Sequence, residues 1–194
     1  AGVTTGEWTD ALREVFGTWR PPASLEGVDP GPGHPVRSEV LAARVRDTAA
    51  ALGCGIRLLV GKPGLDGHSN GAEQVALKAR QAGFEVIYHG IRTTPTQIAE
   101  AALEEGVHAV GLSILSGSHL ELVTEVMERL RAMALEVPVV VGGIIPDGDA
   151  SLLRSRGVQG VFTPGDRDLN VILAKVLDVV RASRGLPVFG DLPS

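Results

Sequence analysis

The run IRLLV at residues 56–60, followed at once by GKPGLDGHSNGAEQ at residues 61–74, shows the unit from which this chain is built. A short apolar run that favours β-structure ends in a glycine-rich loop holding a lysine, an aspartate and a histidine. Apolar residues with helical spacing come next, at Ala72, Val75, Ala76 and Ala79. The pattern predicts a strand, then a loop with polar side chains, then a helix.

The same alternation continues along the rest of the chain. Further short apolar runs lie at residues 84–89, 107–112, 137–141 and 158–162. Helical segments separate them, with capping-box start signals at residues 94–97 and 118–121 and a weaker pattern at residues 147–156. Strands that alternate with helices indicate a sheet covered on both faces. We predict an α/β fold: a flavodoxin-like, doubly wound, five-stranded parallel sheet of strand order 2-1-3-4-5.

The first 54 residues have a different character. Residues 7–20 have the spacing of a short amphipathic helix, with Trp8, Leu12, Val15 and Phe16 on one side. Prolines and glycines at residues 21–35 indicate a linker, and residues 37–53 indicate a second helix ended by Gly53. We predict a helical leader with a Pro/Gly linker at residues 1–54, a folded domain at residues 55–184 and a C-terminal tail at residues 185–194.

Composition and charge exclude several classes of protein. A net charge of −5 argues against a nucleic-acid surface, which normally needs a basic stripe. Cys54 is the only cysteine, so an intrachain disulfide is excluded and a reducing compartment fits. No run approaches the roughly 20 apolar residues of a membrane span. We expect a cytoplasmic protein with neither nucleic acid nor a membrane as partner.

The loops that follow four of the strands indicate where a ligand would bind. In doubly wound sheets, ligands bind at the carboxyl ends of the strands, near the point where the strand order reverses. With the predicted order, that point lies between strands one and three, while the loop after strand two lies further away. Four loops with unusual composition meet at this edge: GKPGLDGHSNG, SILSGSH, GGIIP and TPGD. The sequence therefore predicts a ligand site built by four loops.

One of the five histidines stands out from the others. His34 falls in the linker, His89 and His108 are expected as structural imidazoles in strands, and His119 is expected as an exposed first-turn residue. His68 lies in the glycine-rich loop, two residues after Asp66, so both side chains would face one side of an extended segment. Asp66 could then hold one ring nitrogen and leave the other free and basic, while Lys62 would neutralise the carboxylate.

Residue types narrow the chemistry of this loop without settling it. One histidine is too few for a zinc site, whereas a single axial histidine suits a metal held by a macrocycle. Haem fits poorly, because only 4% of the residues are aromatic. An anion site is also conceivable, although neither a P-loop nor a dinucleotide fingerprint is present, nor the acidic cluster of a phosphoryl acceptor. These features favour a small-molecule site over a purely structural loop.

Three motifs together resemble the signature of a known family. Asp66-x-His68-x-x-Gly71, then Ser113-x-Leu115, then Gly142-Gly143 occur in the order found in cobalamin-binding domains, and the resemblance covers about residues 55–182. Such domains belong to adenosylcobalamin-dependent mutases and to methionine synthase. Within the family, the motifs are most similar to those of acyl-CoA mutases, in particular the C-terminal domain of ethylmalonyl-CoA mutase.

The resemblance implies a role for each motif residue. His68 would replace the cofactor's dimethylbenzimidazole as the axial ligand of cobalt, with Asp66 and Lys62 behind it. The displaced nucleotide tail would enter a slot between the sheet and the first helix of the domain. Slot residues would be Ser113, Leu115, Gly142, Gly143 and Thr163, the two glycines because a flat ring passing close to the backbone leaves no space for a Cβ.

The resemblance also implies cofactor contacts in the loop after the first strand and in the helix that follows it. These are Gly67, Ser69, Asn70, Gly71 and Val75. Two of them have further expected roles, since Gly71 would let the loop fold tightly and Asn70, with Glu73, would cap the helix.

The family resemblance implies a function for the chain as a whole. The cofactor would be adenosylcobalamin and the reaction a radical rearrangement of the ethylmalonyl-CoA to methylsuccinyl-CoA type, with no catalytic residue in this chain. A barrel of roughly 250 residues that holds the acyl-CoA does not fit within 194 residues beside this domain. We therefore expect an inactive chain that works with a substrate-binding barrel domain or large subunit. Alternatives are a corrinoid carrier for methyl transfer, a cobalamin-dependent sensor, and a flavodoxin-like domain without corrin.

Overall fold

The computed structural model describes residues 10–12, 14–15 and 35–193. The described residues of the predicted first helix are helical and exposed. The rest of that helix, the linker up to residue 34, and with them Trp8, Phe16 and His34, lie outside the described residues.

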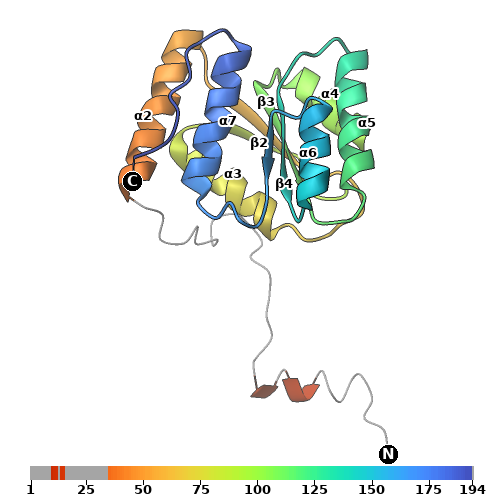
Figure 1. Ribbon diagram of the computed structural model, residues 1–194. Coiled ribbons are helices and arrows are strands. Elements are labelled where there is room, and N and C mark those ends of the chain that lie inside the picture. Colours follow the sequence, from red (N-terminus) through yellow and green to blue (C-terminus); the bar gives the residue numbers. More distant parts are fainter. Residues whose placement is uncertain (1–9, 13, 16–34, 194) are drawn as a thin grey trace, which may run out of the picture.

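Five parallel strands form one sheet in the order β2-β1-β3-β4-β5, which confirms the predicted fold and strand order (Figure 1). The strands are β1 (Arg57–Gly61), β2 (Glu85–Tyr88), β3 (Ala109–Ile114), β4 (Val139–Gly143) and β5 (Gly160–Phe162). The helices are α2 (Pro35–Leu52), α3 (Asn70–Ala82), α4 (Pro95–Glu104), α5 (His119–Ala132), α6 (Asp147–Ser155) and α7 (Leu169–Ser183). The strand order reverses between β1 and β3, so a ligand is expected at the carboxyl ends of these strands.

Two strands lie further along the chain than the apolar runs predicted. The run at residues 107–112 forms β3 two residues later, and the run at residues 137–141 forms β4 two residues later. Val107 is buried ahead of its strand, so its apolar character reflects core packing and not strand pairing. The pairing instead continues through Ser113 opposite Gly142 to Ile114 opposite Gly143, beyond the two predicted runs.

Helices cover both faces of the sheet because alternate strand residues point to opposite sides. Leu59 faces a core shared with α4, α5 and α6. Leu58 and Val60 face a second core shared with α3 and α7. Figure 1 shows these two helical layers on either side of the strands. The second layer also bounds the cavity described below.

Helix α2, which the sequence places in the leader, packs with the folded domain. It lies against α3 and α7, and its Leu41 and Val45 are buried in the same core as those helices. The C-terminal tail returns to α2, where the Arg44 guanidinium donates to the carbonyls of Gly190 and Asp191 at 2.6 and 2.9 Å. Packing therefore joins the chain from Pro35 onward, because α2 buries apolar side chains against α3 and α7, and Phe189 and Leu192 of the tail pack against the same core.

The predicted helix starts are partly confirmed. Thr94 and Gln97 form the predicted reciprocal capping box at the start of α4. The box predicted at Ser118 is wrong, because Ser118 lacks the extended backbone of a capping residue and its side chain makes no cap bond. Capping by Asn70 is also wrong: Asn70 is the first residue of α3, and Ser69 holds the cap position without a side-chain bond.

Candidate functional site

The loop after β1 is held in place by the loop after β2. Thr93 donates from its backbone nitrogen and its hydroxyl to the Lys62 carbonyl, at 3.2 and 2.9 Å, and its own carbonyl accepts from the Gly64 nitrogen at 3.0 Å. Gly64 has φ of +92°, a left-handed conformation that favours glycine. The β2 loop, which the sequence places away from the site, thus sets where the β1 loop leaves the sheet.

Lys62, Asp66 and His68 are joined by hydrogen bonds into one continuous relay, as predicted. The Lys62 ammonium donates to Asp66 Oδ2 at 3.0 Å, and Asp66 Oδ1 lies 2.7 Å from His68 Nδ1. The His68 backbone nitrogen also donates to Asp66 Oδ1 at 3.0 Å. The exposed fraction of the side chain increases along the relay, from 1% for Lys62 to 11% for Asp66 and 84% for His68. The buried Lys62 and Asp66 therefore position the exposed imidazole of His68.

The charge on Asp66 determines which ring nitrogen of His68 carries the proton. Hydrogen bonds from the backbone and the ring of His68 hold the pKa of Asp66 well below its usual range despite burial, and Lys62 acts in the same direction. The carboxylate therefore stays ionised and accepts the proton of Nδ1. In the neutral ring this leaves Nε2 with its lone pair on the exposed side, which is the form of histidine that binds metals.

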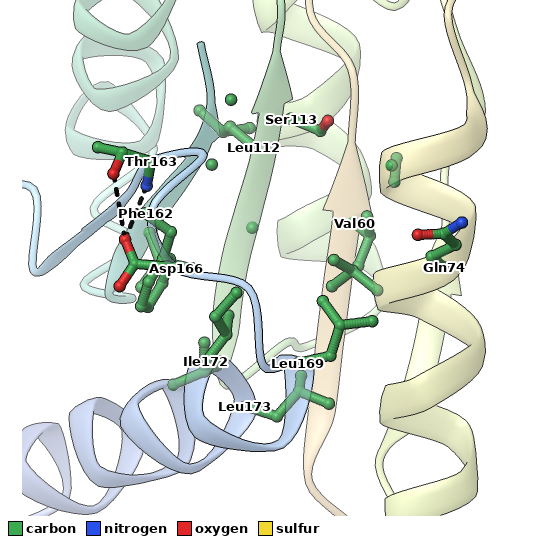
Figure 2. A pocket seen from close by; sticks show the side chains of 18 of the residues that line it. Val60, Gln74, Leu112, Ser113, Phe162, Thr163, Asp166, Leu169, Ile172 and Leu173 are labelled. Atoms are coloured by element: carbon green, nitrogen blue, oxygen red, sulfur yellow. Dashed lines mark hydrogen bonds between the residues drawn. The ribbon is translucent and has the colours of Figure 1, made fainter. Parts of the chain in front are cut away.

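A cavity of about 290 Å³ lies between the sheet and helices α3 and α7. Its lining is mostly apolar, and Figure 2 shows Leu169, Ile172 and Leu173 reaching it from α7 and Gln74 from α3. At the β5 end, the Asp166 carboxylate accepts from the Thr163 nitrogen at 2.9 Å, which closes that loop. The cavity occupies the position predicted for the slot.

The structure divides the predicted site residues into two groups. Seven line the cavity: Gly71, Val75, Ser113, Leu115, Gly142, Gly143 and Thr163. Six belong to the β1 loop or the first residue of α3 and do not line it: Lys62, Asp66, Gly67, His68, Ser69 and Asn70. The groups are joined at the switch point, because the Lys62 ammonium also donates to the Ser113 carbonyl at 3.3 Å.

Three glycines predicted at the site are explained differently by their surroundings. A Cβ at Gly142 would come no nearer than 4.0 Å to a described neighbour, Phe162 Cβ, so it would project into the cavity. A Cβ at Gly143 would collide with the Ile114 backbone, and its φ is +152°, so the fold itself requires this glycine. Gly71 has open space around it and is helical, so the tight loop predicted there is wrong.

A second, wider hollow surrounds His68. Leu65, Leu115, Leu122 and Ile144 line it, and Leu65 is 89% exposed. Leu115 and Ile144 also line the cavity, so the two hollows meet at these residues. Together they form one site, with an open apolar surface around an imidazole nitrogen and a narrow cavity beside it. A flat group could lie on the first and an extension could enter the second.

Sequence reasoning missed several lining residues, which include Gln74, Ile144, Phe162, Asp166, Leu169 and Ile172. For two of them a signal existed, because Ile144 directly follows the Gly-Gly motif and Asp166 belongs to the TPGD loop. Leu169 and Ile172 have the spacing of core residues of α7 and gave no sign that they border an opening.

The placement of His89 and His108 in strands is wrong, because β2 ends one residue before His89 and β3 begins one residue after His108. His108 still has structural surroundings: its Nδ1 accepts from the Arg57 backbone nitrogen at 3.0 Å, and burial, with Arg184 and Arg57, lowers its pKa. The prediction for His119 is wrong, because this side chain is buried. Its Nε2 lies 2.8 Å from Asp149 Oδ2, since α5 and α6 pack against each other there.

Among the described residues, no group of three or more His, Cys, Asp or Glu side chains gathers as metal ligands would. Within the same part of the chain, each helix is too short or too polar to cross a membrane.

Comparison with known proteins agrees with these features. The chain is 48% identical over 188 residues to ethylmalonyl-CoA mutase of Cereibacter sphaeroides and 52% identical over 183 residues to that of Methylorubrum extorquens. The matches cover 93% of this chain but only 27% and 26% of those proteins, so it spans about a quarter of their length. The chain is thus homologous to the B12 domain of these mutases.

A solved structure shows the same fold at low identity. The crystal structure of a cobalamin-binding protein from Desulfitobacterium hafniense DCB-2 matches with a TM-score of 0.54 and 22% identity, over 70% of this chain and 65% of that one. The family described as B12 binding domain matches residues 56–173, which include the relay and most of the cavity lining. Sequence, fold and site geometry therefore agree that this chain belongs to the B12 binding domain family.

Proposed function

We propose that this chain binds adenosylcobalamin with His68 as the axial ligand of cobalt. The benzimidazole tail would lie in the cavity between the sheet and helices α3 and α7. It acts as the cofactor domain of a radical acyl-CoA mutase, of the type that converts ethylmalonyl-CoA to methylsuccinyl-CoA. The observation that carries the proposal is the relay from buried Lys62 through Asp66 to exposed His68, next to an apolar cavity of about 290 Å³.

The residues present fit this cofactor. His68 offers an exposed ring nitrogen while a carboxylate holds the other, which is how proteins orient a metal-binding imidazole. The face of Gly142 leaves room for a flat ring against the strand, and Ser113 lines the same wall with a hydroxyl that a ring nitrogen could use. Apolar side chains at Leu65 and Ile144 would cover the corrin face. When bound, the cofactor supplies the radical chemistry, while the protein orients it and tunes its axial ligand.

The wider role requires more than this chain. The similar mutases are about four times as long, so we assign acyl-CoA binding to a substrate-binding barrel domain or large subunit that covers the His68 side of the sheet. We place the complex in the cytoplasm. The chain alone is expected to bind cofactor and to turn over no substrate.

Electron paramagnetic resonance of the cobalt(II) form tests the axial ligand directly. The purified chain is mixed with cobalamin, reduced, and measured with natural-abundance protein and with nitrogen-15 histidine. A change of the axial splitting from triplet to doublet with labelled protein is expected. A splitting that responds only to nitrogen-15 in the benzimidazole would keep cobalamin binding and refute the role of His68. Failure of the natural chain to bind cobalamin would refute the whole proposal.

The position of the tail is tested with Gly142→Val. The added side chain would fill the cavity, so we expect weaker binding of cobalamin and little change for cobinamide, which lacks the nucleotide tail. Gly148→Val is the matched control, because Gly148 lies on α6 with open space around it. Equal loss for cobalamin and cobinamide in Gly142→Val would place the tail elsewhere. Gly143 is unsuitable for this test, since any Cβ there collides with the backbone.

A further inference from the structure

Arg92, in the loop between β2 and α4, has a backbone conformation that arginine normally avoids. Its φ is +59°, in the left-handed region where a Cβ is disfavoured. Among the described residues, the only other non-glycine residue with positive φ is Ala134, which follows the end of α5, where such residues are common. The same loop has glycine at Gly90, where φ is +79°. At position 92 the chain keeps a long side chain in spite of this preference.

The strained residue is held firmly and points at the candidate site. Its neighbour Thr93 is buried and makes the three hydrogen bonds to the Lys62–Gly64 segment described above. The Arg92 guanidinium lies over the β1 loop, since a Cβ at Gly67 would be 3.6 Å from Nη2. Gly67 directly precedes His68. The cation is therefore placed against the residue that precedes the exposed imidazole in the β1 loop.

In the part of the chain that the structure describes, the Arg92 guanidinium has no hydrogen-bonding or ionic partner. There, Arg92 is exposed and makes neither an ion pair nor a side-chain hydrogen bond. Its N–H groups are donors only, so a partner must supply oxygen acceptors. A backbone outlier next to a functional group is grounds for a functional hypothesis, because strain persists where the surrounding structure imposes it.

We propose that Arg92 is a cofactor-positioning residue that donates hydrogen bonds to a carboxamide oxygen at the edge of the corrin ring. This rests on the proposed function. A corrin centred on His68 carries acetamide and propionamide side chains around its rim, and these offer the required acceptors. The phosphate of the tail is the other source of oxygen. Arg92 lines neither the tail cavity nor the hollow around His68, but its Nη2 lies by Gly67, the residue before His68, on which the corrin would be centred. The corrin edge is therefore the assigned partner.

Arg92→Gly separates a binding role from a structural one. Glycine relieves the backbone, so we expect the Tm of the cofactor-free chain to rise by about 2–4 °C. The same change should weaken adenosylcobalamin binding by about 3- to 10-fold, the usual range for one hydrogen bond. A residue that only supports the loop would change stability and affinity in the same direction. Ala134→Gly is the matched control, which relieves the other left-handed residue and should leave affinity unchanged.

Binding to altered corrinoids identifies the contact. Arg92→Gly should weaken cobinamide as much as cobalamin, whereas a loss confined to cobalamin would assign Arg92 to the tail and overturn the proposal. In the b-, d- and e-monocarboxylates of cobalamin, a carboxylate replaces one propionamide. For one of them, the affinity difference between the natural chain and Arg92→Gly should be larger than for cobalamin, because a carboxylate facing the guanidinium strengthens the pair. Unchanged affinity of Arg92→Gly for every corrinoid would also overturn it. If the natural chain binds no corrinoid, the proposed function fails instead.

Discussion

Two aspartate–histidine pairs lie at the same edge of the sheet and have opposite burial. In the first, the carboxylate of Asp66 is 11% exposed and the imidazole of His68 is 84% exposed, with 2.7 Å between them. In the second, the imidazole of His119 is 6% exposed and the carboxylate of Asp149 is 35% exposed, with 2.8 Å between them. The contacts are nearly identical in length, so distance alone does not distinguish their roles.

The difference lies in what remains available after the pair has formed. His119 uses both ring nitrogens, one toward Asp149 and the other 3.3 Å from the Ser116 carbonyl, so it joins the first turns of α5 and α6. His68 uses only Nδ1 among the described residues and keeps Nε2 on the exposed side. Of these two imidazoles, only that of His68 keeps a ring nitrogen without a partner among the described residues.

Removal of the exposed imidazole should have the largest effect on the cofactor and the smallest on the fold. In His68→Ala we expect complete loss of protein-nitrogen coupling in the cobalt(II) spectrum. Stability should stay within about 1 kcal/mol of the natural chain, because an exposed side chain is lost and Lys62 still pairs with Asp66. Urea unfolding measures the second quantity. Retained protein-nitrogen coupling in this variant would show that another residue, and not the exposed imidazole of His68, binds cobalt.

Removal of the buried imidazole should have the reverse effect. In His119→Ala the Asp149 carboxylate and the Ser116 carbonyl lose their partner and a small void is left, at a cost of about 2–3 kcal/mol in the free energy of unfolding. Axial coordination by His68 should persist, since the relay lies in another loop. Loss of coupling in a variant that remains folded would show that the His119 pair also shapes the site. His119→Gln, which can keep one hydrogen bond, should recover part of the stability.

Loss of the carboxylate charge in the first pair should weaken the ligand without removing it. Asp66→Asn leaves His68 in place but lowers its basicity, with a cost of about 10- to 100-fold in cobalamin affinity. That range corresponds to about 1.4–2.7 kcal/mol. Asp149→Asn serves as the matched control in the second pair and should leave affinity unchanged. Equal affinities for Asp66→Asn and the natural chain would mean that the relay does not tune the ligand.

The first pair should also make stability depend on pH at the acid end. Because the pKa of Asp66 is lower in the folded chain than its usual value of about 4, the charged form stabilises the fold. This contribution is complete above about pH 5 and is lost as the pH falls below the unfolded value. The stability difference between the natural chain and Asp66→Asn should therefore be largest near neutral pH and shrink below about pH 4. A difference that does not change between pH 7 and pH 3 would contradict this linkage.

Much of the site could be predicted because its residues are close in sequence. Lys62, Asp66 and His68 lie within seven positions, so spacing in an extended loop was enough to place them together. The strand order brought the loops after β1, β3, β4 and β5 to one edge, since parallel strands share the edge of their carboxyl ends. The family resemblance then pointed to Ser113 and Gly142, which pair with each other in neighbouring strands. Prediction failed where a side chain's surroundings come from distant segments, as for His119, whose burial depends on Asp149 thirty residues away.

The sequence by itself determined the strands, the relay and the family, because each is encoded in local periodicity or in a short motif. The strand order was predicted as the flavodoxin-like arrangement of such an alternation, and the structure confirms it. Only the tertiary structure showed that Gly143 serves the backbone while Gly142 opens the cavity, because neighbours from another strand decide what a Cβ would meet. Only the tertiary structure also showed that α2 packs against the domain and that the Arg92 guanidinium lies close to Gly67. These features depend on which distant surfaces pack together, and one-dimensional spacing carries no record of such contacts.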